Sequence, residues 1–351
     1  MNYYTVALFL STLAMVIIQI CVDKSNILTK KRKHLFKSLF NVIIVCSICE
    51  WCGWYLQSVD SKARLFHILV KTIELSLAPM IGCLVAWIIE KRDEKFVYWV
   101  LSINCILEVL SALFGFIFYV DVNGIYHHAD FYWIYVVMYL LSLCYCNFII
   151  FKNTKKYQYN GSGYFLVLSL FLLTGIGIQL FNSQLKVIYF TLCIGSIMLY
   201  VFTLEMISQT DELSGLLNRR GFENCVCRLE NTSIVIFFDV DDFKNINDQY
   251  GHSFGDEVIE KIGWQLKRVY AKYGKCFRYG GDEFCVVLNY RLDDVEALNR
   301  QFLEYLRKED INVSLGYAYY EVGHIHIDDV IKQADENMYQ NKIKRKQDCD
   351  N

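Results

Sequence analysis

The sequence predicts an N-terminal all-α bundle of seven transmembrane helices followed by a soluble C-terminal α/β domain. Three observations lead to this prediction. The chain has 351 residues, of which 54% are hydrophobic and only one is proline, so its apolar character does not come from a proline-rich segment. Long apolar runs dominate residues 1–207, whereas residues 208–351 mix charged and apolar residues. Within that second part, helix and strand patterns alternate.

Seven apolar stretches are long enough to cross a bilayer, which takes about 20 apolar residues in a helix. They are residues 3–22, 35–57, 65–89, 96–120, 131–151, 164–181 and 187–207. The first lacks the small-residue cleavage site of a signal peptide, so we expect it to be retained. Because lipid cannot satisfy backbone hydrogen bonds, runs this apolar are expected to be helical. The lipid bilayer is therefore an expected partner of residues 1–207.

Basic residues are concentrated in alternate loops between these stretches. The loops after the first, third and fifth stretches contain Lys24, Lys30, Lys31, Arg32, Lys33, Lys91, Arg92, Lys95, Lys152, Lys155 and Lys156. The basic residues of the other loops are Lys62, Arg64 and Lys186. Since basic loops stay in the cytoplasm, we predict that the N-terminus lies outside and that residues 208–351 lie in the cytoplasm.

Ionisable residues inside the apolar stretches are candidates for function, because a charge in lipid is costly. They are Glu50, Lys71, Glu74 and Glu108. Lys71 and Glu74 are three residues apart and share a helix face, which favours a structural pair over a ligand or proton sensor. In the outer loop predicted over residues 121–130, His127 and His128 are interpreted as solvated rather than as a metal site. The sequence does not identify the sensory ligand.

The charge and the cysteines exclude some classes of protein. A formal net charge of -2 gives no reason to expect nucleic-acid binding. The 14 cysteines are scattered and lie mostly in apolar runs, unlike the disulfide framework of a small secreted domain. Cys46, Cys49 and Cys52 form C-x-x-C spacings inside a membrane-length run. We interpret them as packing residues rather than as metal or redox ligands.

The second part of the chain has the pattern of an α/β sandwich. Helices are predicted over residues 216–229, 255–273, 293–308 and 327–342, and strands over residues 233–240, 275–279, 284–290 and 311–320. No proline- or glycine-rich linker precedes it. The last membrane helix is therefore expected to run directly into this domain.

The first of two acidic strand ends comes with the strand over residues 233–240. Asp239 lies at its end, and Asp241 and Asp242 come just before a helix start. Carboxylate oxygens are ligands that Mg²⁺ prefers, and the free N–H groups at a helix N-terminus bind phosphate oxygens. The arrangement is suited to a divalent cation together with a phosphate.

The second acidic strand end is the run Gly280-Gly281-Asp282-Glu283. Its glycines permit a tight hairpin turn and leave room for a nucleotide near the backbone. Two such ends on neighbouring strands are suited to two metal ions. On this ground alone a common hairpin and a solvated acidic loop stay open as alternatives.

Residues 278–284, with the sequence RYGGDEF, resemble the signature of GGDEF-domain diguanylate cyclases. Residues 211–220 are similar to the opening motif of that family, with Ser214 where threonine is usual. Other similar motifs come in the family's order: FDVDDFK at 238–244, Asn247-Asp248, Gly251-His252, Gly255-Asp256-Glu257, Ser314-Leu315-Gly316, Ala334-Asp335, Met338-Tyr339 and Lys342. The resemblance spans residues 211–346 and implies a palm-like nucleotidyl-cyclase fold.

The resemblance also implies a metal and catalytic centre. Asp239, Glu283 and the carbonyl of Val240 would bind Mg²⁺, with Mn²⁺ as an alternative, at two ions per active site. Asp282 and Glu283 fall at the acidic positions of the signature. Asp282 would support deprotonation of the attacking 3′-hydroxyl and balance charge at the metals.

The substrate-binding positions implied by the resemblance surround one GTP molecule. Asn247 and Asp256 match the guanine-reading positions, because a carboxylate accepts from guanine N1–H and N2–H and an amide serves the O6/N7 edge. Lys cations offset the charge of a triphosphate. The complete set is Asn247, Asp256, Lys244, Lys342, Phe243, Gly280 and Gly281.

Two motifs of the family are altered in this sequence. Many members carry an inhibitory product site, R-x-x-D, whose positions here are Ala271 and Gly274, so no allosteric inhibitory site is expected. The last basic motif, usually glycine then arginine, reads Lys344-Arg345-Lys346. Whether Arg345 or Lys346 contacts phosphate stays open, because lysine does not reproduce the fork of arginine.

The function implied is condensation of two GTP molecules into cyclic di-GMP and pyrophosphate at a bacterial inner membrane. Each domain would bind one GTP, which implies a homodimer through this domain and the membrane helices. The main alternative is a catalytically inactive GGDEF-like module that binds GTP and signals through a partner. Retention of Asp239, Asp282 and Glu283 favours the enzyme. A membrane receptor or transporter regulated by the cyclase domain is a third interpretation.

Overall fold

The computed structural model describes residues 3–57, 63–90, 94–156, 162–182, 185–289, 294–323 and 326–350. The chain divides into two compact units. Unit 1 comprises Met1–Thr154 and Asn160–Leu204, and unit 2 comprises Lys155–Tyr159 and Glu205–Asn351. The boundary predicted between residues 207 and 208 lies close to the division after Leu204.

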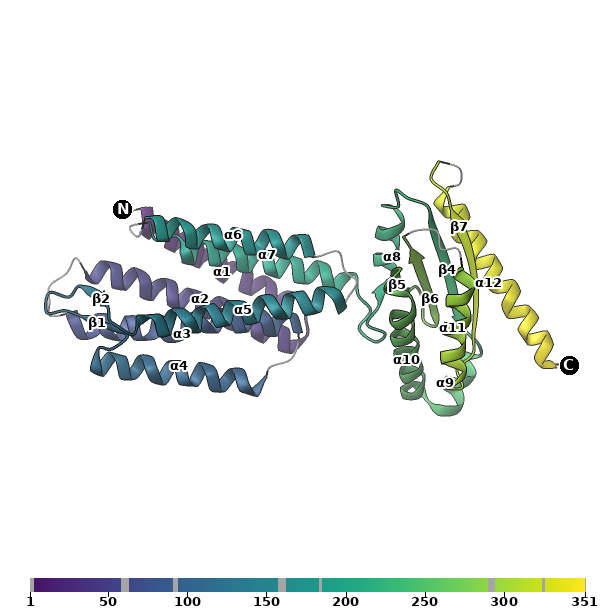
Figure 1. Ribbon diagram of the computed structural model, residues 1–351, viewed down its shortest axis with the longest axis horizontal. Helices are drawn as coiled ribbons and strands as arrows, with labels where there is room; N and C mark the ends of the chain where they lie inside the picture. Colours follow the sequence, from purple (N-terminus) through teal and green to yellow (C-terminus); the bar gives the residue numbers. More distant parts are fainter. Residues whose placement is uncertain are drawn as a thin grey trace. The chain divides into compact units, whose positions relative to one another are not determined.

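Unit 1 is built from long helices (Figure 1). They are α1 (Tyr3–Lys24), α2 (Lys30–Leu56), α3 (Arg64–Glu90), α4 (Lys95–Phe114), α5 (Tyr132–Lys156), α6 (Ser162–Phe181) and α7 (Ile188–Ser208). Within the described residues, six helices are long and apolar enough to cross a membrane, and α6 contributes only the shorter apolar stretch Leu166–Gln179. Helices are thus found at all seven predicted positions, but a count of seven spans is not confirmed.

The fourth predicted span, residues 96–120, was wrong at its C-terminal end. Helix α4 ends at Phe114, because Gly115 adopts a φ of 71° and its N–H donates to the carbonyl of Ser111 at 2.7 Å. The apolar residues after Gly115 do not continue the helix. Ile117 is fully buried in a small core beneath the segment that comes next, which explains the hydrophobicity of this run.

The predicted outer loop contains a short antiparallel hairpin of β1 (Phe118–Val120) and β2 (Tyr126–His128). His128 stacks on Tyr132 with their ring centroids 3.7 Å apart. His127 lies 3.4 Å from the carboxylate of Asp121. The hairpin thus holds both histidines beside these partners, while His128 is exposed and His127 is partly exposed.

The ionisable residues in the apolar helices differ in their partners. Lys71 and Glu74 form the predicted pair, with Nζ and Oε2 2.7 Å apart, and the Tyr189 hydroxyl also donates to Glu74. Glu50 instead accepts from the Tyr4 hydroxyl at 2.7 Å. Glu108 is fully buried, and neither of its carboxylate oxygens has a hydrogen-bond partner among the described residues.

Unit 2 is an α/β sandwich around a five-stranded sheet. Its elements are β3 (Leu217–Asn218), α8 (Arg219–Val226), β4 (Ser233–Val240), α9 (Phe243–Tyr250), α10 (His252–Tyr270), β5 (Gly274–Arg278), β6 (Glu283–Leu288), α11 (Val295–Arg307), β7 (Val313–Tyr320) and α12 (Ile327–Asp350). The strand order is β3-β5-β6-β4-β7. Strands β3 and β5 are parallel, and the other pairs are antiparallel.

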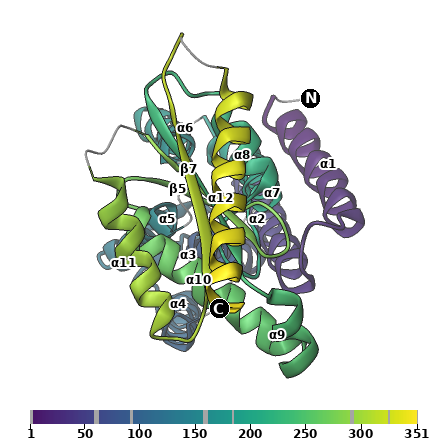
Figure 2. The same ribbon diagram turned by 90° about the vertical axis from the view of Figure 1, so that its right-hand side faces the viewer.

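Helices cover both faces of this sheet. Along the central strand β4, Ile234, Ile236 and Phe238 pack with α10 and α11, whereas Val235 and Phe237 pack with α8 and α12. Figure 2 shows β7 between α11 and α12. Because side chains alternate along a strand, a sheet covered on both faces needs a continuously apolar central strand, and residues 233–238 are all buried.

Most boundary differences in unit 2 have a local cause. The strand predicted over residues 233–240 has those bounds, but the helix predicted over 216–229 begins only at Arg219. Its start is fixed by Asn218, whose side chain accepts from the N–H of Gly221 at 3.0 Å. Helix α12 is longer than predicted and runs to Asp350. Residues 343–350, with the sequence IKRKQDCD, have no apolar periodicity that could have marked this part of the helix.

Candidate functional site

Two neighbouring strands bring the predicted metal carboxylates side by side. Asp239, near the end of β4, is paired directly with Glu283, the first residue of β6. In an antiparallel pair, side chains directly opposite each other point to the same face. The N–H of Val240 donates to the carbonyl of Asp282 at 3.2 Å. The structure therefore gathers Asp239, Val240, Asp282 and Glu283 at one edge of the sheet.

The turn between β5 and β6 places its glycines against Glu283. The N–H groups of Tyr279 and Gly280 both donate to the Glu283 carbonyl, at 2.8 and 3.2 Å. A Cβ on Gly280 would lie 2.5 Å from Glu283 Oε2, so the absence of a side chain there makes room for the carboxylate. A Cβ on Gly281 would meet nothing within 4 Å. The turn is thus open on the Gly281 side, as a ligand approaching the backbone requires.

The carboxylates at this edge of the sheet favour the binding of a cation. Burial raises the pKa of Glu283, and the nearby carboxylates of Asp239, Asp282 and Asp335 raise it further. Lys342, from α12, donates a hydrogen bond to Asp239 Oδ1. Burial alone would lower the pKa of Lys342, but this bond and the charges of the aspartates leave it raised overall. The ammonium of Lys342 is thus the positive charge that faces Asp239.

The donor set at the strand ends fits a divalent cation. Among the described residues, no three His, Cys, Asp or Glu side chains form a group that could hold a metal. Asp239 and Glu283 supply two carboxylates, and the Val240 carbonyl supplies a third oxygen donor. Mg²⁺ in nucleotide sites is typically held by one or two carboxylates together with substrate phosphates and water, which matches this incomplete set.

Asp241 ties the loop after β4 to α12 and β7. Its carboxylate accepts from the Ser314 hydroxyl at 2.6 Å and from Arg345 Nη1 at 3.1 Å. Arg345 also donates to the carbonyl of Val313 at 2.5 Å. Arg345 is thus engaged with the protein itself, and the side chain of Lys346 lies outside the described residues. Sequence reasoning missed this contact, although the Ser314-Leu315-Gly316 motif and the basic run after Lys342 were both visible.

The predicted guanine-reading residues form a second group on α9 and α10. A Cβ on Gly255 would lie 2.0 Å from Asn247 Oδ1 and 3.3 Å from Phe243 Cζ, so both side chains pack directly on this glycine. Asp256 comes directly after Gly255 and is exposed, and Lys244 is exposed on α9. Helix α9 begins shortly after Val240, which attaches this group to the first one.

The start of α9 is shaped for an anion. Asp242, just before it, adopts a left-handed conformation with φ 53°, and its side chain makes no capping hydrogen bond. A left-handed aspartate is uncommon and is held there by its surroundings. The first N–H groups of α9 therefore lack a side-chain cap, and such groups bind phosphate oxygens well.

Arg278 connects the turn to the segment that enters unit 2. Its Nη1 lies 3.2 Å from both carboxylate oxygens of Asp211, and its Nη2 donates to the carbonyl of Gly281 at 2.7 Å. Asp211 also accepts from the N–H and hydroxyl of Ser214, at 2.8 and 2.7 Å. Burial alone would raise the pKa of Asp211, but the bonds from Ser214 and the charge of Arg278 leave it lowered overall.

The same segment is bonded to the end of α7. Asn218 donates from Nδ2 to the carbonyl of Ser208 at 2.9 Å and from its backbone N–H to the carbonyl of Gln209 at 2.9 Å. Hydrogen bonds therefore tie Ser208, the last residue of α7, to the same entry segment whose Asp211 binds Arg278. No pattern in the sequence pointed to Arg278 as the link, because its partner lies far away in the chain.

The comparison with known proteins identifies unit 2. The family model described as "Diguanylate cyclase, GGDEF domain" matches residues 208–348. These residues form a GGDEF domain. The resemblance noted in the signature, the opening motif and the motifs between them is thereby confirmed.

Relatives of this GGDEF domain include enzymes that make and break cyclic di-GMP. Diguanylate cyclase DgcN of Escherichia coli is 35% identical over 152 residues, which are 38% of this chain and 37% of DgcN. Cyclic di-GMP phosphodiesterase NbdA of Pseudomonas aeruginosa is 29% identical over 156 residues, 40% of this chain and 20% of NbdA. The chain thus spans only about a third of the length of DgcN, and the similarity concerns the GGDEF domain.

The comparison with solved structures also found a GGDEF domain similar to part of this chain. The GGDEF domain of DgcB from Caulobacter crescentus, solved in complex with c-di-GMP, is 28% identical, with a TM-score of 0.36. The match covers 39% of this chain and 89% of that domain.

Proposed function

We propose that this chain is a membrane-bound diguanylate cyclase that condenses two GTP molecules into cyclic di-GMP and pyrophosphate. The observation that carries the proposal is the pairing of Asp239 with Glu283 beside Gly280 and Gly281, within a GGDEF domain. Curated relatives named diguanylate cyclases support it.

The residues at the strand ends would handle the metal and the triphosphate. Asp239, Glu283 and the Val240 carbonyl would hold Mg²⁺ or Mn²⁺, at two ions per site. Such ions, when bound, offset the charge of the phosphates and assist loss of a proton from the 3′-hydroxyl. Asp282, on the same turn, would support that deprotonation. Lys342, which now bonds Asp239, lies where its charge would serve the phosphates instead.

The guanine base would lie against α9 and α10. Exposed Asp256 would accept from N1–H and N2–H, and Asn247 would bind the O6/N7 edge. Phe243 and Asn247 are held in place by their contacts with Gly255. Lys244, exposed on the first turn of α9, would add a cation near the anion-binding end of that helix.

The reaction needs two such domains, because each 3′-hydroxyl attacks the α-phosphate of the other GTP. We infer a homodimer through the GGDEF domain and the membrane helices. The chain would lie in a bacterial inner membrane with its catalytic domain in the cytoplasm. The long apolar helices of unit 1 and the basic loops that alternate between them support this placement.

The membrane helices would regulate the enzyme through α7. Asn218 donates to the carbonyl of Ser208 at the end of α7, and Arg278 donates both to Asp211 in the entry segment and to Gly281 in the catalytic turn. A shift of α7 would reach the turn through these contacts and would also change how two GGDEF domains face each other.

Product analysis tests the proposal. Full-length protein in nanodiscs is incubated with GTP and Mg²⁺ and compared with Glu283→Gln and with Glu223→Gln, an exposed control in the same domain. We expect cyclic di-GMP from the wild type and the control, and a loss of more than about 100-fold in Glu283→Gln because a metal carboxylate is removed.

The alternative of an inactive GTP-binding module predicts a different result. GTP would bind to the wild type, but no cyclic di-GMP would form. A forced dimer of residues 208–351 distinguishes this case from an enzyme held inactive without its signal. Product from the forced dimer would support the cyclase, and bound GTP without product would reject it.

A further inference from the structure

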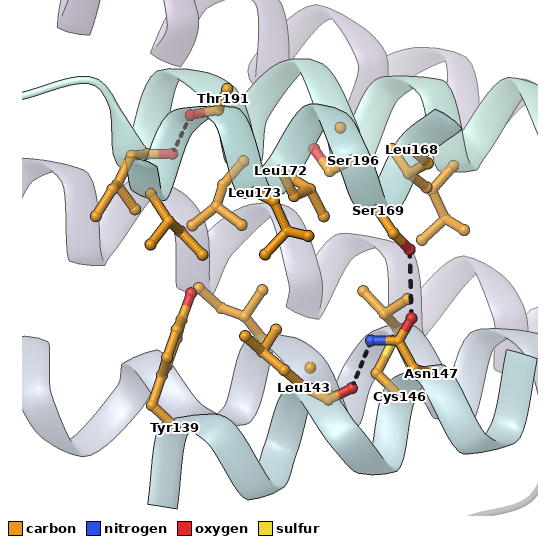
Figure 3. A pocket seen from close by; sticks show the side chains of 18 of the residues that line it. Tyr139, Leu143, Cys146, Asn147, Leu168, Ser169, Leu172, Leu173, Thr191 and Ser196 are labelled. Atoms are coloured by element: carbon orange, nitrogen blue, oxygen red, sulfur yellow. Dashed lines mark hydrogen bonds between the residues drawn. The ribbon is translucent and has the colours of Figure 1, made fainter. Parts of the chain in front are cut away.

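A cavity of about 340 Å³ lies inside unit 1, among α2, α3, α5, α6 and α7 (Figure 3). Its walls are mainly aliphatic, with Leu143 from α5, Leu168, Leu172 and Leu173 from α6, and Leu192 from α7. Pockets that bind small molecules have volumes of about 300–1,000 Å³ and mostly apolar walls. The size and lining are therefore those of a site for an apolar ligand.

Four polar side chains in the walls, Asn147, Ser169, Thr191 and Ser196, form hydrogen bonds within the protein. Asn147 donates to the carbonyl of Leu143 at 2.9 Å and accepts from the Ser169 hydroxyl at 3.3 Å, as Figure 3 shows. Thr191 and Ser196 each donate back to their own helix, to the carbonyls of Val187 and Cys193. With these groups committed, the cavity favours a ligand portion without polar atoms.

Close contacts between helices stop the walls from filling the space. A Cβ on Gly82 of α3 would lie 2.7 Å from the carbonyl oxygen of Ser142 on α5. A Cβ on Gly195 of α7 would lie 2.9 Å from Leu172 Cδ2 on α6. Both glycines line the cavity, and neither can be replaced by a larger residue without a shift. The glycines therefore add no side chains that could occupy the cavity.

The rim of the cavity faces the hydrocarbon that would surround these helices. Leu140 and Cys144 on α5 and Leu173 on α6 line the cavity and are also exposed on the surface of unit 1. Of the helices that line the cavity, α2, α3, α5 and α7 are long and apolar enough to cross a membrane, and α6 contributes the shorter apolar stretch Leu166–Gln179. Molecules dissolved in a bilayer therefore have access, whereas water-soluble molecules do not.

We propose that this cavity binds the hydrocarbon chain of a membrane-dissolved molecule. The chain would enter between α5 and α6 and would contact Leu192, Ser196 and Leu199 of α7. Since α7 runs on to Ser208 at the start of the GGDEF unit, occupancy would act on the helix that regulates the enzyme. This last step rests on the proposed cyclase function, whereas the binding itself does not.

Photolabelling tests the binding. Full-length protein in nanodiscs is irradiated with palmitic acid carrying a mid-chain diazirine, and the labelled peptides are identified by mass spectrometry. A second arm uses phosphatidylglycerol with the same photoreactive acyl chain, which distinguishes a free fatty acid from a bilayer lipid. We expect saturable labelling of the peptides that contain Leu140 and Leu173, competed by unlabelled palmitic acid in the first arm.

Matched variants locate the site. Leu192→Trp, and independently Ile176→Trp on α6, fill the cavity and should abolish the saturable labelling. Phe190→Trp is the control, because Phe190 lies on the same helix, is 44% exposed and does not line the cavity. Equal labelling in all three variants, or unsaturable labelling spread along the exposed helix faces, would overturn the proposal. So would a disulfide between the Cys144 residues of two copies on mild oxidation, since a second copy would then cover the rim.

The cyclase assay separates the two parts of the inference. If saturable labelling occurs and cyclic di-GMP synthesis changes with added palmitic acid in the wild type but not in Leu192→Trp, both parts are supported. Saturable labelling with an unchanged rate of synthesis overturns the action on α7. Labelling without any cyclic di-GMP, even from the forced dimer, rejects the cyclase and leaves the binding site intact.

Discussion

The carboxylate of Glu283 should make metal binding pH-dependent. Its pKa is raised by burial and by neighbouring carboxylates, among them Asp335. The metal needs the ionised form, so affinity is expected to fall as the pH is lowered through this pKa. Asp335→Asn removes one negative charge and lowers the Glu283 pKa, which moves the pH midpoint of metal loss downward.

Mn²⁺ binding to the full-length protein, followed by electron paramagnetic resonance across pH, measures that midpoint. Asp328→Asn, on the exposed first turn of the same helix, serves as the control and should leave it unchanged. An upward shift in Asp335→Asn would contradict the assignment of Glu283 as the titrating ligand.

Arg278 should stabilise the GGDEF domain through its fork. Arg278→Lys cannot bond Asp211 and Gly281 together, and we expect a loss of about 1–2 kcal/mol in the free energy of opening the sheet. Arg300→Lys is the matched control, because Arg300 forms exposed pairs with Asp294 and Glu296 that contribute less than about 0.5 kcal/mol. Hydrogen exchange of the buried β4 amides reports both values. Similar losses in the two variants would mean that the Arg278 contacts add nothing specific.

The backbone around Gly274 leaves no room for the aspartate of the inhibitory product site. A Cβ there would lie 2.1 Å from the carbonyl oxygen of Val287, so an aspartate at this position would not fit without a backbone shift. Ala271 likewise offers no group for a guanine or a phosphate. Titration of the product into the cyclase assay should show no noncompetitive inhibition through this site. Strong noncompetitive inhibition by the product would contradict this prediction.

Helix α12 packs so closely on β7 that its backbone lies against Gly316. A Cβ on Gly316 would lie 2.0 Å from the N atom of Met338 and 2.6 Å from the carbonyl oxygen of Ala334. Because backbone cannot move aside as a flexible side chain can, Gly316→Ala should destabilise the domain by about 1–3 kcal/mol. It should also displace Lys342 and Arg345, which lie further along the same helix.

Hydrogen exchange of β4 and β7 amides measures the loss. Gly281→Ala is the comparison, since a Cβ there meets nothing within 4 Å and stability should stay within about 0.5 kcal/mol. Equal protection in Gly316→Ala and the wild type would show that α12 can move away from the sheet at little cost.

The elements that could be predicted are those with a clear hydrophobic pattern. The run SIVIFFDV gave β4 with its observed bounds, since a strand buried on both faces is continuously apolar. The hairpin after Gly115 could not be predicted, because its apolar residues extend the pattern of α4 and only the left-handed glycine ends the helix. Helix α9 was visible only as a helix start after the acidic residues, since it is short and has no buried residue.

Part of the candidate site could also be named from the sequence. Asp239, Glu283 and the two glycines could be named, because the strand ends and the turn are local features of the sequence. The contacts that hold them could not: Lys342 reaches Asp239 and Arg278 reaches Asp211 from more than 60 residues away. Long-range ion pairs leave no periodicity, so only the folded chain reveals them.

Because α7 connects the membrane helices to the GGDEF domain, regulation of the enzyme should depend on the rotation of this domain about the axis of α7. Each residue inserted after Ile207 would rotate the GGDEF domain about the helix axis by about 100°, whereas four residues nearly complete a turn. One or two inserted alanines should therefore disturb the regulation of cyclic di-GMP synthesis more than four. The same alanines inserted after Val322, in an exposed turn, are the control. Unchanged regulation in every insertion would reject transmission by α7.

If the contacts that Asn218 makes with Ser208 and Arg278 makes with Gly281 couple the membrane helices to the catalytic turn, the coupling also acts in the reverse direction. Coupling between two binding sites is reciprocal, so a membrane ligand that changes GTP affinity must have its own affinity changed by GTP to the same factor. The occupancy of the membrane site would then report the nucleotide supply of the cell as well as the composition of the bilayer. Under the proposed coupling, each ligand alone would shift the occupancy of the other site, and the two shifts in affinity would be equal.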